Sequence, residues 1–574
     1  MNGESPPALK PARRGYSLSY KNKTLLSTVD PVAQGERTAL RSIRPDRTLY
    51  FCPSPLLGYG LDTLLASGGD SAVLCVETDG ALLDLSRSSI DRAILEHPRF
   101  ALTGRKSGAE LCRLVREKWG ARSFRRLETV KLSGGWQLDG GSYEEAAELL
   151  RRDISLDWEN AMTLVKLGRR FIANALRNLA AAIRSPPFPA GAFGTGPALV
   201  LGAGPSLDPL LDAFQRAGIF DLDRRPFTLI CVDTCLAPLR ERRIRPDLAV
   251  ILESQFWNLR DFTGSRNTRI PAALDLSAWP PSGEVLGGPR YFFFTPWTHL
   301  RLFDRLGEAG LLPAALPPLG SVGLTAVELA RRLGPGPVIT GGIDFSFTLD
   351  ALHARSSPAH LAALAETNRF RSMLNPGAAF RRGGYRAFSK SGGPVRSNPA
   401  MRTYRGLFER EFAADRRIRD IAGSGLPLGV ETLSVEEAAA MLSAGPPRSA
   451  PGFGPGSGPE PKPGPKPGPG NSAVAAAGPD GDGTDGGGQA VAAAFFRRER
   501  EQLETLRSVL TGSAPAADLE RALDEADYLW AHFPDCAGAE SRRPPGSDLG
   551  FLKRVRAEID PFIALWRLAE KELV

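Results

Sequence analysis

Long apolar runs, histidine and cysteine are all scarce in this chain of 574 residues. No run approaches the roughly 18 apolar residues that a membrane-spanning helix requires, and the N-terminal segment lacks the apolar core of a secretory signal. The six cysteines are scattered, and the closest two, Cys231 and Cys235, fall in and just after a buried-looking strand. We therefore expect a cytoplasmic protein with no membrane span and no disulfide framework.

The charge balance is only mildly basic. A formal net charge of +8 is modest for this length and does not by itself indicate nucleic acid, which we do not expect as a partner. A basic surface of this kind suits an anionic small molecule or an acidic protein equally well. With 42% hydrophobic residues, the chain has ample apolar surface for two to four globular domains.

Two phosphate-binding fingerprints are missing. The P-loop pattern GxxxxGK[ST] occurs nowhere, so P-loop phosphoryl transfer is unsupported. The stretch ALVLGAGPSLD at residues 198–208 lacks the third glycine of a dinucleotide fingerprint, because Leu207 stands in its place. The next acidic strand end, Asp233, comes 31 residues after Gly202, where about 20 are expected. A dinucleotide site therefore fits poorly.

Composition divides the chain into five segments. Residues 444–488 alternate proline and glycine with few apolar residues, which predicts a disordered linker. Apolar residues recur with a helical period in 489–574 and predict a tethered helical module. Upstream, the patterns predict a smaller N-terminal α/β domain at 20–140, a helical connection at 141–190 and a central domain at 191–443.

The central domain alternates apolar strands with amphipathic helices. Strands without polar alternation, separated by helices, indicate a parallel sheet covered on both faces, so we expect a Rossmann-like α/β fold. In such sheets, ligands bind beyond the carboxyl ends of the strands. The expected strands are 198–204, 227–234, 247–254, 291–295 and 337–345.

The segment after the first of these strands has the features of a phosphate site. Glycines let the backbone approach a ligand closely, and serine is a good N-cap for the helix that follows. Free N–H groups at a helix start suit a phosphate, although a strand–helix turn without any ligand is the alternative. A second helix start follows at residue 320. The candidate nucleotide-binding residues here are Gly202, Gly204, Pro205, Ser206, Gly320 and Ser321.

Acidic residues end three of the predicted strands. Asp233 with Thr234, Glu253 and Asp344 fall on one rim of the expected sheet, where they could bind ribose hydroxyls, a base edge or a metal. Each alone is equally compatible with an ordinary helix cap. His353 follows Asp344 in a loop that leaves the same edge, so we predict that it acts as a general base, with Asp344 orienting sugar or base.

Four segments of the central domain resemble those of the motility accessory factors (Maf): LGAGPSLD, ICVDTCLAPLRERRIRPDLAVILES, GSVGLTAVELARRLG and ITGGIDFSFT. The same domain type occurs in archaeal 6-hydroxymethylpterin diphosphokinases and is called MptE-like. The segments LLSTVDPVAQGER and GGPVRSNPAMRTYRGLFEREF are also similar to Maf sequences. The resemblance spans roughly residues 20–440 and leaves out the linker and the C-terminal module.

The resemblance implies a glycosyltransferase. Maf proteins are implicated in attaching nonulosonic acids to flagellin serines and threonines, and the segments GPSL and GIDF are similar to those of sialyltransferases that use CMP-sialic acid. By this resemblance, a CMP-sugar donor would be held by residues 202–206, and flagellin would be the acceptor. Asp344 lies in the matching late-strand motif, whereas the choice of His353 rests on its position alone.

Three alternatives stay open. A pterin diphosphokinase reaction would use ATP and Mg²⁺ held by the strand-end carboxylates. In the N-terminal domain, Gly58 and Gly60, with Glu77 at the next strand end, resemble the pattern of an adenosylmethionine site. A non-catalytic flagellar accessory protein would use the C-terminal helices as its binding element.

Overall fold

The computed structural model describes residues 6–66, 69–120, 123–188, 195–220, 225–349, 351–370, 383–445, 486–512, 519–534, 536 and 548–573. Of the predicted linker, residues 446–485 lie outside this part of the chain. The chain forms two compact units. The first comprises Met1–Arg169 with Trp530–Phe551, and the second comprises Arg170–Leu529 with Leu552–Val574.

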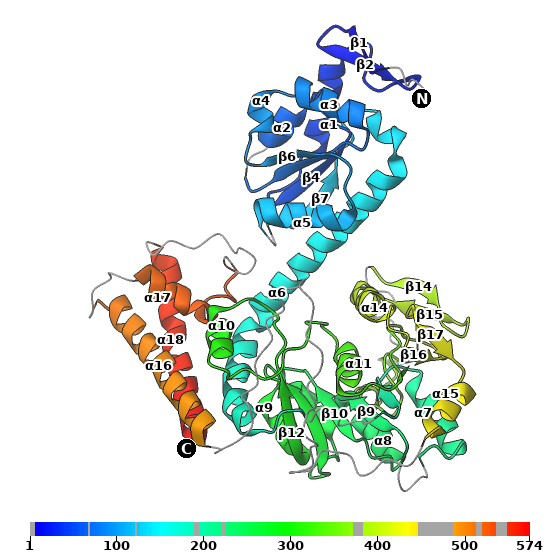
Figure 1. The fold of residues 1–574 in the computed structure, drawn as a ribbon, viewed down its shortest axis with the longest axis vertical. Coiled ribbons are helices and arrows are strands. Elements are labelled where there is room, and N and C mark those ends of the chain that lie inside the picture. Colours follow the sequence, from blue (N-terminus) through cyan, green and yellow to red (C-terminus); the bar gives the residue numbers. More distant parts are fainter. Residues whose placement is uncertain are drawn as a thin grey trace. The chain divides into compact units, whose positions relative to one another are not determined.

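The first unit contains a four-stranded parallel sheet with helices on its faces (Figure 1). The strand order is β6-β5-β4-β7, and a small antiparallel sheet of β1–β3 precedes it. The strands are β1 (Ala8–Pro11), β2 (Tyr16–Tyr20), β3 (Lys23–Thr24), β4 (Thr48–Pro53), β5 (Ala72–Val76), β6 (Phe100–Thr103) and β7 (Arg126–Thr129). The helices are α1 (Pro31–Ser42), α2 (Leu61–Ala66), α3 (Gly80–Ser89), α4 (Arg92–Leu95) and α5 (Gly108–Trp119).

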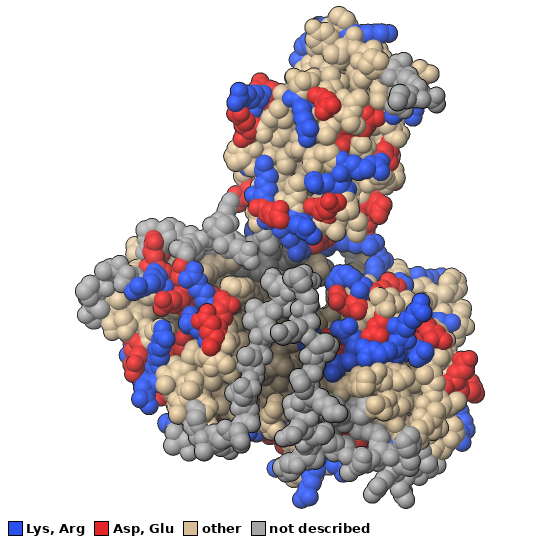
Figure 2. Space-filling view, viewed as in Figure 1, with Lys and Arg blue, Asp and Glu red and all other residues tan. Residues whose placement is uncertain are grey.

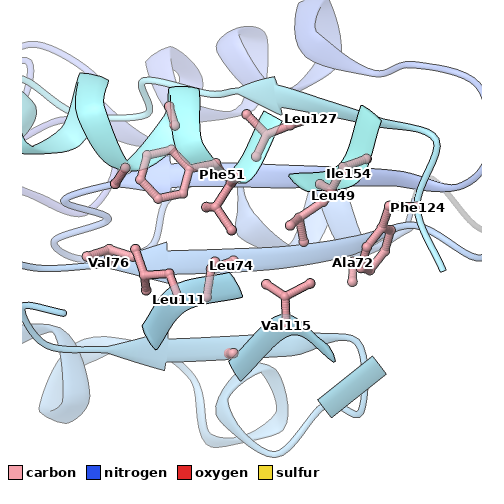
Figure 3. Close-up of a cluster of buried hydrophobic side chains, with 14 of the residues drawn as sticks. Leu49, Phe51, Ala72, Leu74, Val76, Leu111, Val115, Phe124, Leu127 and Ile154 are labelled. Atoms are coloured by element: carbon pink, nitrogen blue, oxygen red, sulfur yellow. The ribbon is translucent and has the colours of Figure 1, made fainter. Parts of the chain in front are cut away.

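Alternate residues of the central strands fill two separate cores. Leu49 and Phe51 of β4 pack with Leu111 and Val115 of α5 on one face of the sheet (Figure 3). Tyr50, between them in sequence, points to the other face and its own apolar cluster. Because both faces are covered, the strand carries an uninterrupted apolar run, as buried parallel strands do.

The glycines that imitate an adenosylmethionine site have a packing role. Gly60 has a φ of +94°, and a Cβ there would lie 2.6 Å from the carbonyl oxygen of Gly35 in α1. The close approach of this loop to α1 therefore requires glycine. The adenosylmethionine interpretation loses its main support, because a close helix contact already explains the pattern.

The second unit contains the predicted parallel sheet, which has eight strands in the order β12-β11-β10-β9-β8-β13-β16-β17. Every pair of neighbours in it is parallel, so the α/β fold class is confirmed. The strands are β8 (Ala198–Leu201), β9 (Thr228–Val232), β10 (Leu248–Ile251), β11 (Ile270–Asp275), β12 (Gly287–Phe293), β13 (Val338–Gly341), β16 (Ile418–Ile421) and β17 (Glu431–Leu433). Strands β14 (Tyr385–Phe388) and β15 (Pro394–Ser397) form a separate two-stranded hairpin.

The helices of this unit follow the expected alternation. They are α7 (Leu207–Arg216), α8 (Leu236–Glu241), α9 (Pro280–Val285), α10 (Arg301–Glu308), α11 (Val322–Leu333), α12 (Pro358–Ala365), α14 (Pro399–Phe412) and α15 (Val435–Ser443). Short 3-10 turns, η2 (Asp233–Cys235) and η3 (Phe256–Phe262), follow β9 and β10.

The order of the strands creates a switch point beside β8. The chain runs outward from β8 to β12, and α11 then returns it to β13 on the other side of β8 (Figure 1). Helix α11 contacts β8, β9, β10 and β13, and residues 323–330 of it are all buried. In open α/β sheets such a switch point, at the carboxyl ends of the strands, is where ligands bind.

The predicted helical connection is one long helix, α6 (Gly140–Arg184). Its last turns belong to the second unit, where two buried asparagines hold them in place. The Nδ2 group of Asn174 donates to the carbonyls of Ser254 and Ser277 at 2.9 and 3.0 Å. Asn178 donates in the same way to the carbonyls of Leu276 and Ala278. The ends of β10 and β11 are thereby fixed to α6.

The C-terminal helices, α16 (Gly486–Leu510), α17 (Leu519–Glu525) and α18 (Leu549–Leu573), are held to α10 by a buried ion pair. Arg305 Nε and Nη2 each lie 2.7 Å from a carboxylate oxygen of Glu499, whose side chain is only 2% exposed. The backbone N–H of Arg301 also donates to Asp527 at 2.8 Å. The predicted helical module therefore packs on the central domain.

Two surface properties bear on the expected partners. No helix in the described part of the chain is long and apolar enough to cross a membrane. Basic and acidic side chains are interspersed over the face that Figure 2 shows, in keeping with the modest net charge.

We expect Arg305→Met to lower the free energy of unfolding by about 3–5 kcal/mol, because it leaves the buried Glu499 carboxylate without its partner. The double variant Arg305→Met, Glu499→Met should recover most of this loss. Arg507→Met, at an ion pair whose Asp560 is 71% exposed, is the control and should cost no more than about 1 kcal/mol. Urea unfolding measures all three, and a similar small loss for both single variants would contradict the docking.

Candidate active site at the switch point

The loops after β8 and β13 pack backbone against backbone. The N–H groups of Gly202 and Gly204 donate to the carbonyls of Gly341 and Gly342, each at 2.8 Å. A Cβ on Gly202 would lie 2.6 Å from the carbonyl oxygen of Gly342, which itself has a φ of +71°. The glycines in GAG are therefore explained by contact between two strand-end loops, which requires them whether or not a ligand is present.

Ser206 donates two hydrogen bonds to the buried carboxylate of Asp344. Its N–H donates to Asp344 Oδ2 at 2.7 Å and its hydroxyl to Asp344 Oδ1 at 2.6 Å. Ser206 stands at the N-cap position of α7, as predicted, but its side chain makes no capping hydrogen bond to the helix. Asp344, which is 3% exposed, occupies the anion position at the start of α7 that the sequence assigned to a phosphate.

Lys390 and Asp420 extend this network. Lys390 Nζ lies 2.5 Å from Asp420 Oδ2 and donates to the carbonyl of Ile421 at 3.1 Å. Thr340 donates to the other oxygen of Asp420 at 2.8 Å. Burial raises the pKa of Asp420 to about 6 and also raises that of Asp344, although the Lys390 ammonium opposes both shifts.

The loop after β16 closes over these groups. A Cβ on Gly425 would lie 2.6 Å from Asp344 Oδ1 and 3.0 Å from the Lys390 side chain. A Cβ on Gly423 would lie 2.9 Å from the Cβ of Ser206. Sequence reasoning missed Lys390 and Asp420, which belong to no recognised motif. The GSG run at 423–425, directly after a strand, was the available signal, because it repeats the pattern of 202–204.

A second acidic cluster lies at the ends of β9 and β10. Asp233 accepts hydrogen bonds from Asn258 Nδ2 at 3.0 Å and from the N–H of Thr234 at 2.8 Å. The hydroxyl of Thr234 reaches Asp261 at 3.3 Å. Burial, followed by the charge of Asp261, raises the pKa of Asp233 to about 7. Glu253 is exposed and contributes to a raised pKa of Asp261.

The predicted acidic rim thus divides into two clusters, one at Asp344 and one at Asp233. Among the residues that the structure describes, no three histidine, cysteine, aspartate or glutamate side chains are arranged to hold a metal ion. The carboxylates instead bind neighbouring serine, threonine, asparagine and lysine groups.

The start of α11 is the more accessible helix terminus at this edge. Gly320 is exposed with a φ of +67°, and Ser321 makes no side-chain capping bond. A Cβ on Gly320 would lie 3.2 Å from the ring of Tyr404 in α14. The Tyr404 and Phe345 ring centroids are 6.4 Å apart, and Phe345 has a φ of +47°, a strained value for a non-glycine residue. Helix α11, helix α14 and the loop that contains Phe345 therefore meet at a helix start that Ser321 does not cap.

His353 is exposed and lies beside the loop after β8. The N–H of the next residue, Ala354, donates to the carbonyl of Ala203 at 2.9 Å, which holds the two loops together. Surrounding protein atoms displace water from the ring and lower the pKa of His353, and the charges of Arg260 and His360 lower it further. The imidazole is therefore neutral near pH 7 and able to accept a proton.

The family model described as "6-hydroxymethylpterin diphosphokinase MptE-like" matches residues 172–350. The chain contains an MptE-like domain. This MptE-like domain begins at the last turns of α6 and ends just after the Asp344 loop, so it holds both acidic clusters and the start of α11. Lys390, Tyr404 and Asp420 lie beyond the matched residues.

Two similar proteins extend the comparison over the whole chain. An uncharacterised protein of Treponema pallidum (strain Nichols) is 29% identical over 577 residues, which cover 98% of this chain and 95% of the relative. The solved structure of the Maf glycosyltransferase from Magnetospirillum magneticum AMB-1 superposes with a TM-score of 0.53 at 13% identity, covering 100% of this chain and 90% of that one. The fold that the resemblance to Maf proteins predicted is confirmed, and so is the MptE-like domain.

Asp233 should make stability depend on pH. Its pKa of about 7 in the folded protein exceeds the ordinary 3.8, so between these values the folded state holds a proton that the unfolded chain has released. Stability therefore falls as pH rises through this window. Asp233→Asn removes this titration and should gain stability relative to the unmodified protein as the pH is raised.

Urea unfolding at several pH values between about 4.5 and 8 measures this difference. Asp84→Asn, at an exposed position of α3, is the control and should follow the unmodified protein at every pH. A stability difference for Asp233→Asn that stays constant across the window would contradict the assignment.

Proposed function

We propose that this protein is a glycosyltransferase that moves a nonulosonic acid from a CMP-activated donor to a hydroxyl of a protein acceptor, flagellin in the first instance. The fold in common with a Maf glycosyltransferase and the MptE-like domain support transfer chemistry of this class. The observation that carries the proposal is the uncapped start of α11 at the switch point, beside the rings of Tyr404 and Phe345.

The donor phosphate would bind at the start of α11. The N-cap residue of this helix, Ser321, makes no side-chain cap, whereas α7 already has the Asp344 carboxylate at its start. The ring of Tyr404, next to Gly320, offers a face on which the base could stack. Residues 202–206 then form the floor of the site, with Asp344 as a positioning residue that holds Ser206.

The reaction itself needs a proton acceptor and a stabilised leaving group. The acceptor hydroxyl oxygen forms a bond to the anomeric carbon of the sugar, and the bond from that carbon to the CMP phosphate oxygen breaks. The electron pair leaves with CMP, which the helix N-terminus stabilises. His353, neutral because its pKa is lowered, takes the hydroxyl proton. No step is assigned to a metal ion, and an assay arm with EDTA tests a magnesium requirement.

The name of the matching family favours a second candidate, ATP-dependent pyrophosphoryl transfer to a pterin alcohol. That reaction would place ATP at the same switch point. Calorimetric titrations with CMP and with ATP distinguish the two, because each reaction needs its own nucleotide. Binding of ATP without binding of CMP would favour the second candidate over the first.

Ser321→Asp should weaken CMP binding by at least about tenfold, because the new carboxylate repels the phosphate at the start of α11. The fold should persist, since aspartate is a favourable residue at a helix N-terminus. Ser321→Ala is the matched control and should change the affinity only slightly. Calorimetry that finds unchanged CMP affinity in Ser321→Asp would place the phosphate elsewhere.

His353→Gln should lower sugar transfer by about 10²–10⁴-fold and leave CMP affinity unchanged, because an amide cannot take the hydroxyl proton. His360→Gln, at the neighbouring histidine in α12, is the control and should keep the normal rate. The readout is the mass of the acceptor protein after incubation with the CMP-activated sugar. Normal transfer by His353→Gln would remove this histidine from the mechanism.

A further inference from the structure

Strand β6 lies at the edge of the first unit's sheet. The carbonyls of Arg99 and Thr103 accept hydrogen bonds from Val73 and Glu77 on the β5 side. Because backbone groups alternate along a parallel strand, Phe100 and Leu102 direct theirs away from β5. The N–H of Phe100 already donates to the carbonyl of His97. The N–H and the carbonyl of Leu102 therefore are the pair of outward backbone groups available to an added strand. In the described part of the chain, β6 pairs with β5 alone.

A cavity of about 340 Å³ lies along this edge. Its floor is formed by residues 100–102 of β6, and its two rims come from opposite faces of the sheet. Leu95, at the end of α4, packs with the apolar cluster on one face, and Leu114 of α5 packs with the cluster on the other. The groove therefore straddles the strand edge and has apolar walls on both sides.

The two charged residues that line the groove are both basic. Arg87, near the end of α3, and Lys118, near the end of α5, both line it and are exposed, whereas its lining contains no acidic residue. Two cations flanking an open strand edge favour an acidic occupant over a basic one. An added strand would use the outward groups of Leu102 for main-chain hydrogen bonds and place alternate side chains on the two apolar walls.

We propose that β6 is a docking site for an extended, acid-rich segment of a partner protein, which pairs with the strand edge and is held by Arg87 and Lys118. This inference is independent of the proposed glycosyl transfer, since the groove belongs to the first unit and its test is a binding measurement. It gives the N-terminal domain a role in partner recognition.

The test uses the full chain and three fluorescein-labelled peptides in fluorescence anisotropy. One peptide alternates glutamate and valine, the second alternates lysine and valine, and the third is the acidic peptide N-methylated at every second residue. The acidic peptide should bind at least about tenfold more tightly than the basic one. N-methylation should abolish its binding, because it removes the main-chain donors that strand pairing needs.

Protein variants locate the site. The double variant Arg87→Glu, Lys118→Glu should weaken binding of the acidic peptide by at least about tenfold. Arg113→Glu makes the same kind of change at an exposed position of α5 outside the groove lining and should leave the affinity within about threefold of normal. Leu102→Pro should also abolish binding, because it deletes the outward N–H while leaving the β5 side of the strand intact.

Four results would overturn the proposal. They are the absence of saturable binding, equal binding of acidic and basic peptides, normal binding of the N-methylated peptide, and a dimer in sedimentation velocity that Leu102→Pro converts to a monomer. The last would make the occupant a second copy of this chain. If Leu102→Pro fails to fold, the N-methylated peptide still decides whether main-chain pairing occurs.

Discussion

The hydrogen bonds from Ser206 to Asp344 are the contact on which the candidate site depends, because they join the loop after the first strand of the second unit to the loop after β13. These strands are neighbours in the sheet although α11 and four other strands separate them in the chain. Lys390 then ties Asp420 and the carbonyl after it into the same network. Moving ionic groups out of water into the protein interior costs free energy. The hydrogen bonds that each of these groups makes offset that cost.

The first unit also contains a buried, hydrogen-bonded acidic residue at the carboxyl end of its sheet. The hydroxyl of Ser54, just after β4, donates to the buried Glu77 carboxylate at 2.6 Å, and Tyr143 donates to its other oxygen at 3.1 Å. Ser54 has a φ of +49°, a costly conformation for serine that the surrounding contacts maintain. In both units a buried acid fixes the loop at a parallel strand's carboxyl end, which shows that such an acid can be structural.

Strands that are continuous apolar runs could be predicted from the sequence, and strands interrupted by proline or charged residues could not. The apolar composition of β8, β9, β10 and β13 was sufficient to predict these strands. Strand β11 is not among the predicted strands; it contains Pro271, which lies where the register shifts between Ile270 and Ala272. Strand β16 reads as charged, since Arg419 and Asp420 lie within its four residues and the aspartate is neutralised by a distant lysine.

Residue types at the site were easier to predict than their partners. Glycine pairs and strand-end acids mark the edge at which the loops after β8 and β13 meet, because these loops need both close approach and polar groups. A local capping rule places Ser206 correctly at the N-cap but cannot predict that its hydroxyl binds Asp344, which lies far along the chain. The role of Lys390 could not be predicted for the same reason. A single lysine in a hairpin gives no local sequence signal that its side chain is buried.

The buried network also sets the electrostatics that any bound anion would meet. With Asp344, Asp420 and Lys390 all ionised, the group carries one net negative charge close to the start of α7. Burial raises the pKa of both acids, to about 6 for Asp420, so that charge weakens as the pH falls toward that value. The start of α7 thus already has its anion, and a second one there would be repelled. Under the proposed function, an incoming phosphate would bind at the start of α11 instead, where Ser321 makes no side-chain cap.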